Sequence, residues 1–145
     1  MIHQPYGDIA GAWRAFIEAQ KAGKVRSIGV SNFSPDRLLD LELMSGVKPA
    51  VNQIEVSPWF QQNKAVEFNQ QDHVQVEAWA PFAEGKRDIF NNPVIMKIAD
   101  KYGKSTSQII LHWIIERELI VIPKTVHRKR MIENIVGASL RALQK

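Results

Sequence analysis

The polar residues of this sequence that could do chemistry stand where runs of apolar, β-branched residues end. They are His3, Ser31, Asn32, Gln53, Trp79 and Lys124. The hydroxyl and amide side chains among them can hydrogen-bond a carboxamide, and the indole can stack on a flat ring. A lysine near a helix start can hold a phosphate, and a histidine can polarise or protonate a carbonyl. These residue types together suit a nicotinamide dinucleotide and a carbonyl substrate.

Each of these residues also has an ordinary structural interpretation. A strand-end histidine such as His3 is more often structural than catalytic, and Ser31-Asn32 before a helix is usually a turn and a cap. A buried Gln53 more often ties down backbone than touches a ligand, and Trp79 is more often a core residue. The basic run 127–130 is usually a solvated helix face. The coincidence of all of them at strand ends therefore carries more weight than any single one.

The elements that would position these residues alternate along the chain. Strands are predicted at 25–30, 50–54, 74–78 and 119–122 after a first one ending at His3, and helices are predicted to begin after Asp8, Ser34, about Asn63, Asn92, Ser105 and about Arg128. This alternation predicts βαβ units in an α/β fold with a mainly parallel sheet. Such folds bind ligands at the carboxyl ends of their strands. The wholly apolar run 119–122 predicts a strand buried on both faces.

The composition narrows the class of protein. The 145 residues are 45% hydrophobic and 23% charged, include no cysteine and carry a net charge of +4. These values predict one folded domain over residues 1–145, without disulfides and in a reducing compartment, the cytoplasm. No apolar run suggests a membrane helix, no leader pattern is visible, and no His/Asp/Glu spacing suggests a metal site. No G-x-G-x-x-G motif or P-loop occurs, which leaves a Rossmann or kinase-type phosphate cradle unsupported.

Read together, several segments resemble the aldo-keto reductase family. They are 2–5, 23–33, 49–55, 78–82 and 122–126, followed by Arg130, Glu133 and Asn134. Their order and spacing follow the family to about Asn134. The resemblance implies a (β/α)8 barrel that reduces aldehydes and ketones to alcohols with NADPH and without metal.

The resemblance also implies roles for individual residues. His3 resembles the catalytic histidine that orients the substrate carbonyl, and Ser31, Asn32 and Gln53 resemble the residues that hold the nicotinamide carboxamide. Trp79 stands where the family places an aromatic side chain against the nicotinamide ring. The family's residues that bind the 2′-phosphate resemble Lys124, Thr125 and Arg130. Those that contact adenine resemble Glu133 and Asn134. Pro81, Phe82 and Val126, from the same matching segments, complete the expected cofactor-binding set.

Only part of the family's barrel is expected from this sequence. Such a barrel needs about 250 residues, and the resemblance begins at the end of the family's fourth strand. The family's catalytic tyrosine, its partner lysine and its aspartate have no counterpart, since neither Tyr6 nor Tyr102 lies in a matching motif. The expected fold is therefore the C-terminal half of a TIM barrel, a truncated and partial domain. Its open sheet edges would favour self-association.

Three functions follow as alternatives. The first is a carbonyl reductase that uses NADPH and a small-molecule substrate. The second is a half-barrel that binds NADP or a partner chain without turnover. The third is a basic module that binds nucleic acid through Lys124 and 128–130, which is the least favoured because aromatic residues do not interleave with the basic ones.

Overall fold

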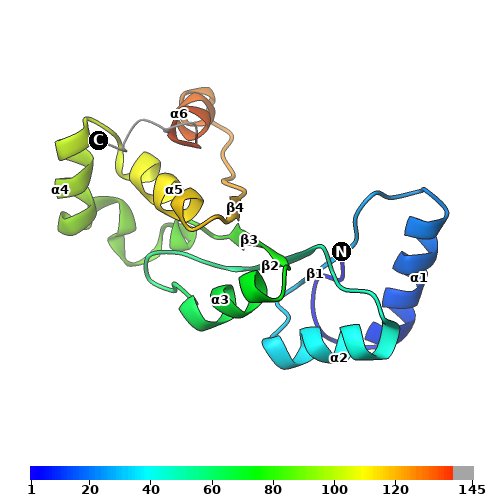
Figure 1. Cartoon of the computed structure of the whole chain (residues 1–145). Helices are drawn as coiled ribbons and strands as arrows, with labels where there is room; N and C mark the ends of the chain where they lie inside the picture. Colours follow the sequence, from blue (N-terminus) through cyan, green and yellow to red (C-terminus); the bar gives the residue numbers. More distant parts are fainter. Residues whose placement is uncertain (139–145) are drawn as a thin grey trace. The chain divides into compact units, whose positions relative to one another are not determined.

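The computed structural model describes residues 1–138 and has the predicted α/β architecture (Figure 1). Its strands are β1 (Gly29–Ser31), β2 (Val51–Glu55), β3 (Gln75–Trp79) and β4 (Ile120–Val121), hydrogen-bonded in the order β1-β2-β3-β4. β1 and β2 run parallel, with Ser31 in register with Gln53. The helices are α1 (Ile9–Lys21), α2 (Pro35–Ser45), α3 (Asn63–Gln71), α4 (Pro93–Tyr102), α5 (Thr106–Glu116) and α6 (Arg128–Ala138), with a 3-10 segment, η1 (Ala83–Asn91). The alternation of strands and helices read from the sequence is confirmed.

Contacts divide the chain into two compact units. Unit 1 comprises Met1–Ile54 and Gln62–Glu77, and unit 2 comprises Glu55–Gln61 and the chain from Ala78 onward. Unit 1 holds α1, α2 and α3, whereas unit 2 holds α4, α5 and α6. Among residues 1–138, no helix is both long enough and apolar enough to cross a membrane.

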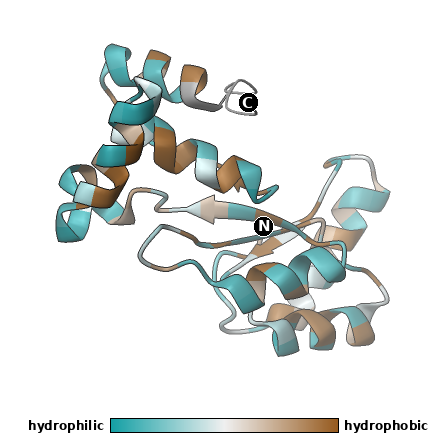
Figure 2. Ribbon diagram, turned by 60° about the vertical axis from the view of Figure 1, so that its left-hand side comes forward, coloured by the Kyte–Doolittle hydropathy of each residue, from teal (hydrophilic) through white to brown (hydrophobic). Residues whose placement is uncertain are grey.

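Unit 1 is built around a buried tryptophan. Trp13 on α1 is fully buried and packs in one cluster with Val30 of β1, Phe33 of the loop that follows, and Leu38 and Leu41 of α2. Its indole Nε1 donates to the hydroxyl of Ser45 at 3.1 Å and to the carbonyl of Val47 at 3.2 Å. Figure 2 shows hydrophobic and hydrophilic segments alternating along the helices, as expected when one face of each helix packs in a core. The core thus joins α1 to the end of α2.

The helix starts follow the local sequence signals with one exception. The Asp8 side chain accepts from the backbone N–H of Gly11, and Ser105 forms the predicted capping box with Gln108 at the start of α5. Ser34 precedes Pro35 at the start of α2 as predicted, but its hydroxyl makes no capping hydrogen bond. It donates to the carboxylate of Asp36 and lowers the pKa of that group.

β1 is shorter than the predicted run 25–30 and lies very close to its neighbour. A Cβ added at Gly29 would come within 2.3 Å of the side chain of Val51 and 2.8 Å of its carbonyl oxygen. Only glycine fits this approach. The expected first strand is reduced to an isolated parallel bridge between Ile2 and Val30, which nevertheless holds His3 beside the end of β1.

Unit 2 packs around α5, which contacts α4, α6 and β4. Ile110, Leu111 and Ile114 supply its buried face. The prediction that the run 119–122 is buried on both faces is wrong: Ile120 and Ile122 are each 45% exposed and the strand is only two residues long. The apolar pattern of the run could not reveal which neighbours would cover it. The segment η1 also escaped prediction, because five of its residues have non-helical backbone angles.

Candidate functional site

Four of the predicted site residues form one hydrogen-bonded cluster in unit 1. The Ser31 hydroxyl donates to the Gln53 carbonyl oxygen at 2.9 Å, and the backbone N–H of Asn32 donates to the same oxygen at 2.9 Å. The Asn32 side-chain amide donates to the Ser31 hydroxyl at 3.1 Å and to the His3 carbonyl oxygen at 3.3 Å. The structure therefore brings His3, Ser31, Asn32 and Gln53 together at the carboxyl ends of β1 and β2.

The residues of this cluster differ in burial and in backbone conformation. Ser31 is fully buried, Asn32 and Gln53 are half-buried, and His3 is exposed. Asn32 has a φ of 59°, in the left-handed region that asparagine tolerates better than most residues. This turn points its side chain back across the end of β1. A histidine open to a ligand beside ordered hydroxyl and amide groups can engage a carbonyl while its neighbours hold a carboxamide.

Two residues that the sequence did not assign to the site support this cluster. The Gln53 side-chain amide donates to the carboxylate of Glu77 on β3. Asn52, fully buried, accepts from the backbone N–H of Phe33 at 3.4 Å and donates to the carbonyl of Phe33 at 2.9 Å. Because side chains alternate along strands, the period of two could have placed Gln53 and Glu77 on one sheet face. The contact of Asn52 with a loop 19 residues away in sequence gave no local signal.

A cavity of about 430 Å³ in unit 2 gathers six more of the predicted residues. They are Phe82, Lys124, Thr125, Arg130, Glu133 and Asn134. Glu84, Gly85, Phe90 and Ser107 also line it, and the sequence did not predict them. Ser107 lies in the first turn of α5, and a helix start favours anions. The donor set, two cations with hydroxyl groups, fits a phosphate.

Charges around this cavity are partly paired. The carboxylate of Glu84 bonds to Lys86 and raises the pKa of that ammonium, so the acidic group is neutralised locally. Glu133 lies 3.9 Å from Lys129, and its carbonyl accepts from the Gln108 amide at 3.2 Å. Lys124 and Arg130 are exposed. Since the nearby carboxylates have cationic partners, these two side chains give the cavity its positive character.

Three predicted residues lie outside both groups. Val126 is 71% exposed and does not line the cavity. Trp79 is half-buried, and its carbonyl accepts from the backbone N–H of Val56 at 3.2 Å. Pro81 is buried. Their contact with a cofactor stays a prediction.

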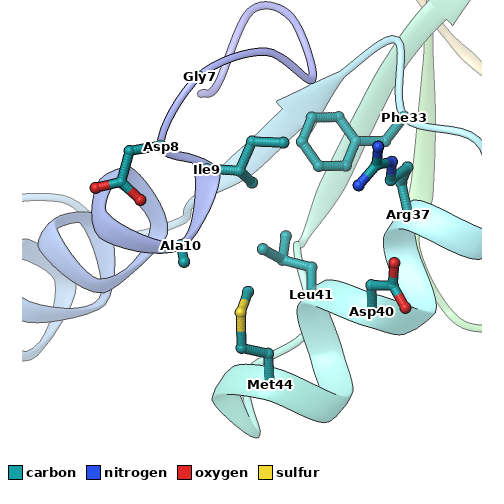
Figure 3. A pocket seen from close by; sticks show the side chains of 9 residues that line it. All are labelled: Gly7, Asp8, Ile9, Ala10, Phe33, Arg37, Asp40, Leu41 and Met44. Carbon is teal, nitrogen blue, oxygen red and sulfur yellow. The ribbon is translucent and has the colours of Figure 1, made fainter.

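A second cavity, of about 450 Å³, lies in unit 1 between α1 and α2 (Figure 3). Ile9, Phe33, Leu41 and Met44 point into it, while the carboxylate of Asp8 is turned toward its own helix. No predicted site residue lines this cavity. It is therefore distinct from the cluster around Ser31.

Comparisons with known proteins agree on one family. The sequence model described as "Aldo/keto reductase family" matches residues 1–145. A methylglyoxal reductase of Escherichia coli K12 is 43% identical over 123 residues, which are 85% of this chain and 45% of that protein. The crystal structure of an aldo/keto reductase from Brucella melitensis is 43% identical with a TM-score of 0.87, over 92% of this chain and 52% of that one. That of a Bombyx mori aldo-keto reductase in complex with NADP is 35% identical with a TM-score of 0.83, over 92% and 45%. The chain spans about half the length of the curated relatives it matches.

Proposed function

The chain belongs to the aldo/keto reductase family, and on this premise we propose that it binds NADP(H) and acts in the reduction of small aldehydes and ketones to alcohols. The observation that carries the proposal is the cluster of His3, Ser31, Asn32 and Gln53, because it joins a carbonyl-directed histidine to a set of carboxamide partners. The methylglyoxal reductase among the relatives supports a small carbonyl compound as the substrate.

The chain's own residues divide the work of this reaction. When bound, NADPH supplies the hydride. The exposed His3 imidazole would orient the substrate carbonyl and support the proton that its oxygen must gain. Ser31, Asn32 and Gln53 would hold the nicotinamide carboxamide, and Trp79 would lie against the ring. Lys124, Thr125 and Arg130 would bind the 2′-phosphate, while Glu133 and Asn134 would contact adenine.

A specific observation favours the second candidate, a half-barrel that binds NADP or a partner chain without turnover. The two tyrosines, Tyr6 and Tyr102, are 78% and 37% exposed. Neither forms part of the cluster, whose hydrogen bonds join residues 3, 31, 32 and 53. Among the described residues, therefore, these hydrogen bonds include no tyrosine hydroxyl that could serve as the proton donor. A positioned donor is worth about 10²- to 10⁴-fold in rate, so its lack would nearly abolish turnover.

NADPH consumption separates the two candidates. The full chain is mixed with NADPH and methylglyoxal, and the absorbance of the reduced nicotinamide is followed. Turnover above the rate without protein supports the reductase. NADPH binding without turnover supports the second candidate, and an absence of binding refutes the reductase and the NADP-binding form of the second candidate.

Replacing Arg130 by alanine is expected to weaken NADPH binding by about 10- to 100-fold, since a charge-assisted contact to phosphate is lost. NADH binding should hardly change, because NADH has no 2′-phosphate. Fluorescence titration of both cofactors measures the effect.

Arg128→Ala is the matched control for this change. Arg128 is an exposed arginine on the same helix and does not line the cavity. Equal losses for NADPH and NADH in Arg130→Ala, or an equal loss of NADPH binding in Arg128→Ala, would refute the assigned role.

Binding should also stabilise the fold. At about 100 times its Kd, a ligand that binds only the folded chain adds about 2.7 kcal/mol to the free energy of unfolding. The melting temperature of the full chain is therefore expected to rise with NADPH. A cooperative melt whose melting temperature does not rise with NADPH would contradict the proposed cofactor site.

Two further expectations belong to the same proposal. Open sheet edges favour self-association, which sedimentation of the full chain at several concentrations would measure. A cytoplasmic location, expected from the cysteine-free sequence, is tested by cell fractionation. A monomer at all concentrations would refute the first expectation, and recovery outside the cytoplasm the second.

A further inference from the structure

We propose that Glu77 is a positioning residue that fixes the orientation of the Gln53 amide for cofactor binding. The inference rests on the proposed function and adds a residue that neither the sequence motifs nor the comparisons assign. Its starting point is the hydrogen bond from Gln53 Nε2 to Glu77 Oε1 within unit 1.

The two residues share one face of the sheet. β2 and β3 are neighbours, and both show alternate burial, with Asn52 and Ile54 buried on β2 and Val76 and Ala78 on β3. Gln53 and Glu77 fall on the opposite, half-buried face. Their side chains therefore meet where water is partly excluded and where a ligand at the Ser31 cluster can still reach Gln53.

The chemistry of the pair determines which end of the amide faces outward. A carboxylate accepts hydrogen bonds and donates none, so it selects the NH₂ end of Gln53 rather than its oxygen. The other end, Oε1, is then directed away from Glu77 as an acceptor. A carboxamide NH₂ group needs such an acceptor. Without the carboxylate, the amide could turn over and present its own NH₂ group to the ligand.

The backbone of Gln53 is held by hydrogen bonds from the end of β1. Its carbonyl oxygen accepts both the Ser31 hydroxyl and the backbone N–H of Asn32. These bonds fix the strand position of Gln53, but they do not act on the end of its side chain. Glu77 supplies that remaining restraint, since among the hydrogen bonds of the described residues its carboxylate is the partner of the Gln53 amide.

A double-mutant cycle on the full chain tests the proposal. NADPH is titrated into wild type, Glu77→Leu, Gln53→Leu and the double variant. Glu77→Leu is expected to weaken NADPH binding about tenfold in the wild-type background, as for other hydrogen bonds to charged groups, and to have almost no effect once Gln53 is leucine. Glu77→Gln keeps an acceptor oxygen but adds an NH₂ donor, so it no longer selects one end of the Gln53 amide and is expected to weaken NADPH binding, by less than Glu77→Leu does.

Two controls separate positioning from general damage. Binding of 2′,5′-ADP, which has the phosphate but no carboxamide, should not change in Glu77→Leu. Glu67→Leu removes another glutamate that accepts from a glutamine, Gln71 at 3.3 Å, on the exposed side of α3. This variant should bind NADPH like wild type.

The outcomes divide clearly. A loss in Glu77→Leu that persists in the Gln53→Leu background, or that extends to 2′,5′-ADP, would mean a structural role and overturn the proposal. The side-chain NH₂ resonances of Gln53, measured by NMR without cofactor, should shift in Glu77→Leu, and unchanged resonances would also overturn it. A third outcome is that those resonances shift but wild type binds no NADPH. The proposed function, and with it the role of Glu77 in cofactor binding, would then be refuted. The hydrogen bond between Gln53 and Glu77 would still be supported.

Discussion

Replacing His3 by alanine is expected to lower the rate of NADPH-dependent aldehyde reduction by about 10²- to 10⁴-fold, the effect of removing a group that orients a carbonyl and assists its protonation. NADPH binding should change little. The contact of His3 with Asn32 uses the main-chain oxygen, at 3.3 Å, which alanine retains. Steady-state kinetics and a cofactor titration on the same variant measure the two quantities.

An exposed histidine outside the cluster gives the matched control. His73 follows α3 with a φ of 59°, so asparagine is the suitable replacement in this left-handed position. His73→Asn should reduce aldehydes at the wild-type rate. Equal turnover in wild type and His3→Ala would show that the imidazole takes no part in the reaction.

The largest expected effect on stability comes from Trp13. Trp13→Ala should lower the free energy of unfolding by about 3–5 kcal/mol, since it leaves a cavity among Val30, Phe33 and Leu38. A domain of this size is usually stable by about 5–15 kcal/mol, so the loss is a large fraction of the total. Urea unfolding followed by circular dichroism measures it.

Two further variants serve as controls for the effect of Trp13→Ala on stability. Trp13→Phe keeps most of the side-chain volume but loses the hydrogen bonds to Ser45 and Val47. Its smaller decrease in the free energy of unfolding would therefore measure what these hydrogen bonds contribute to stability. Tyr6→Ala, at a residue 78% exposed, should unfold within about 0.5 kcal/mol of wild type. A Trp13→Ala chain as stable as Tyr6→Ala would contradict the assignment of this core.

The order of the elements and most of their starts can be predicted from local sequence signals. Helical periodicity placed α1 and α5, and the residues Asp8 and Ser105 act as caps because a side-chain oxygen within three residues reaches the free N–H groups of a helix start. The strand-end residues His3, Ser31, Asn32 and Gln53 were also predicted as site residues from the sequence, where their types and the family motifs coincide. These signals are local in the chain or follow from the geometry of parallel strands.

Contacts between residues far apart in the sequence become visible only in the folded chain. The pairing of Gln53 with Glu77 joins residues 24 positions apart, and that of Asn52 with Phe33 joins residues 19 apart. The burial of the run 119–122 depended on what covers it, and Ile120 and Ile122 are exposed despite their apolar character. The periodicity of a sequence predicts which side chains share one face of a helix or strand. Which other side chains they contact, and whether they are shielded from water, depends on how separate elements pack together. For this reason the sequence could predict Gln53 as a site residue, whereas only the folded chain shows that its amide donates to a carboxylate on the next strand.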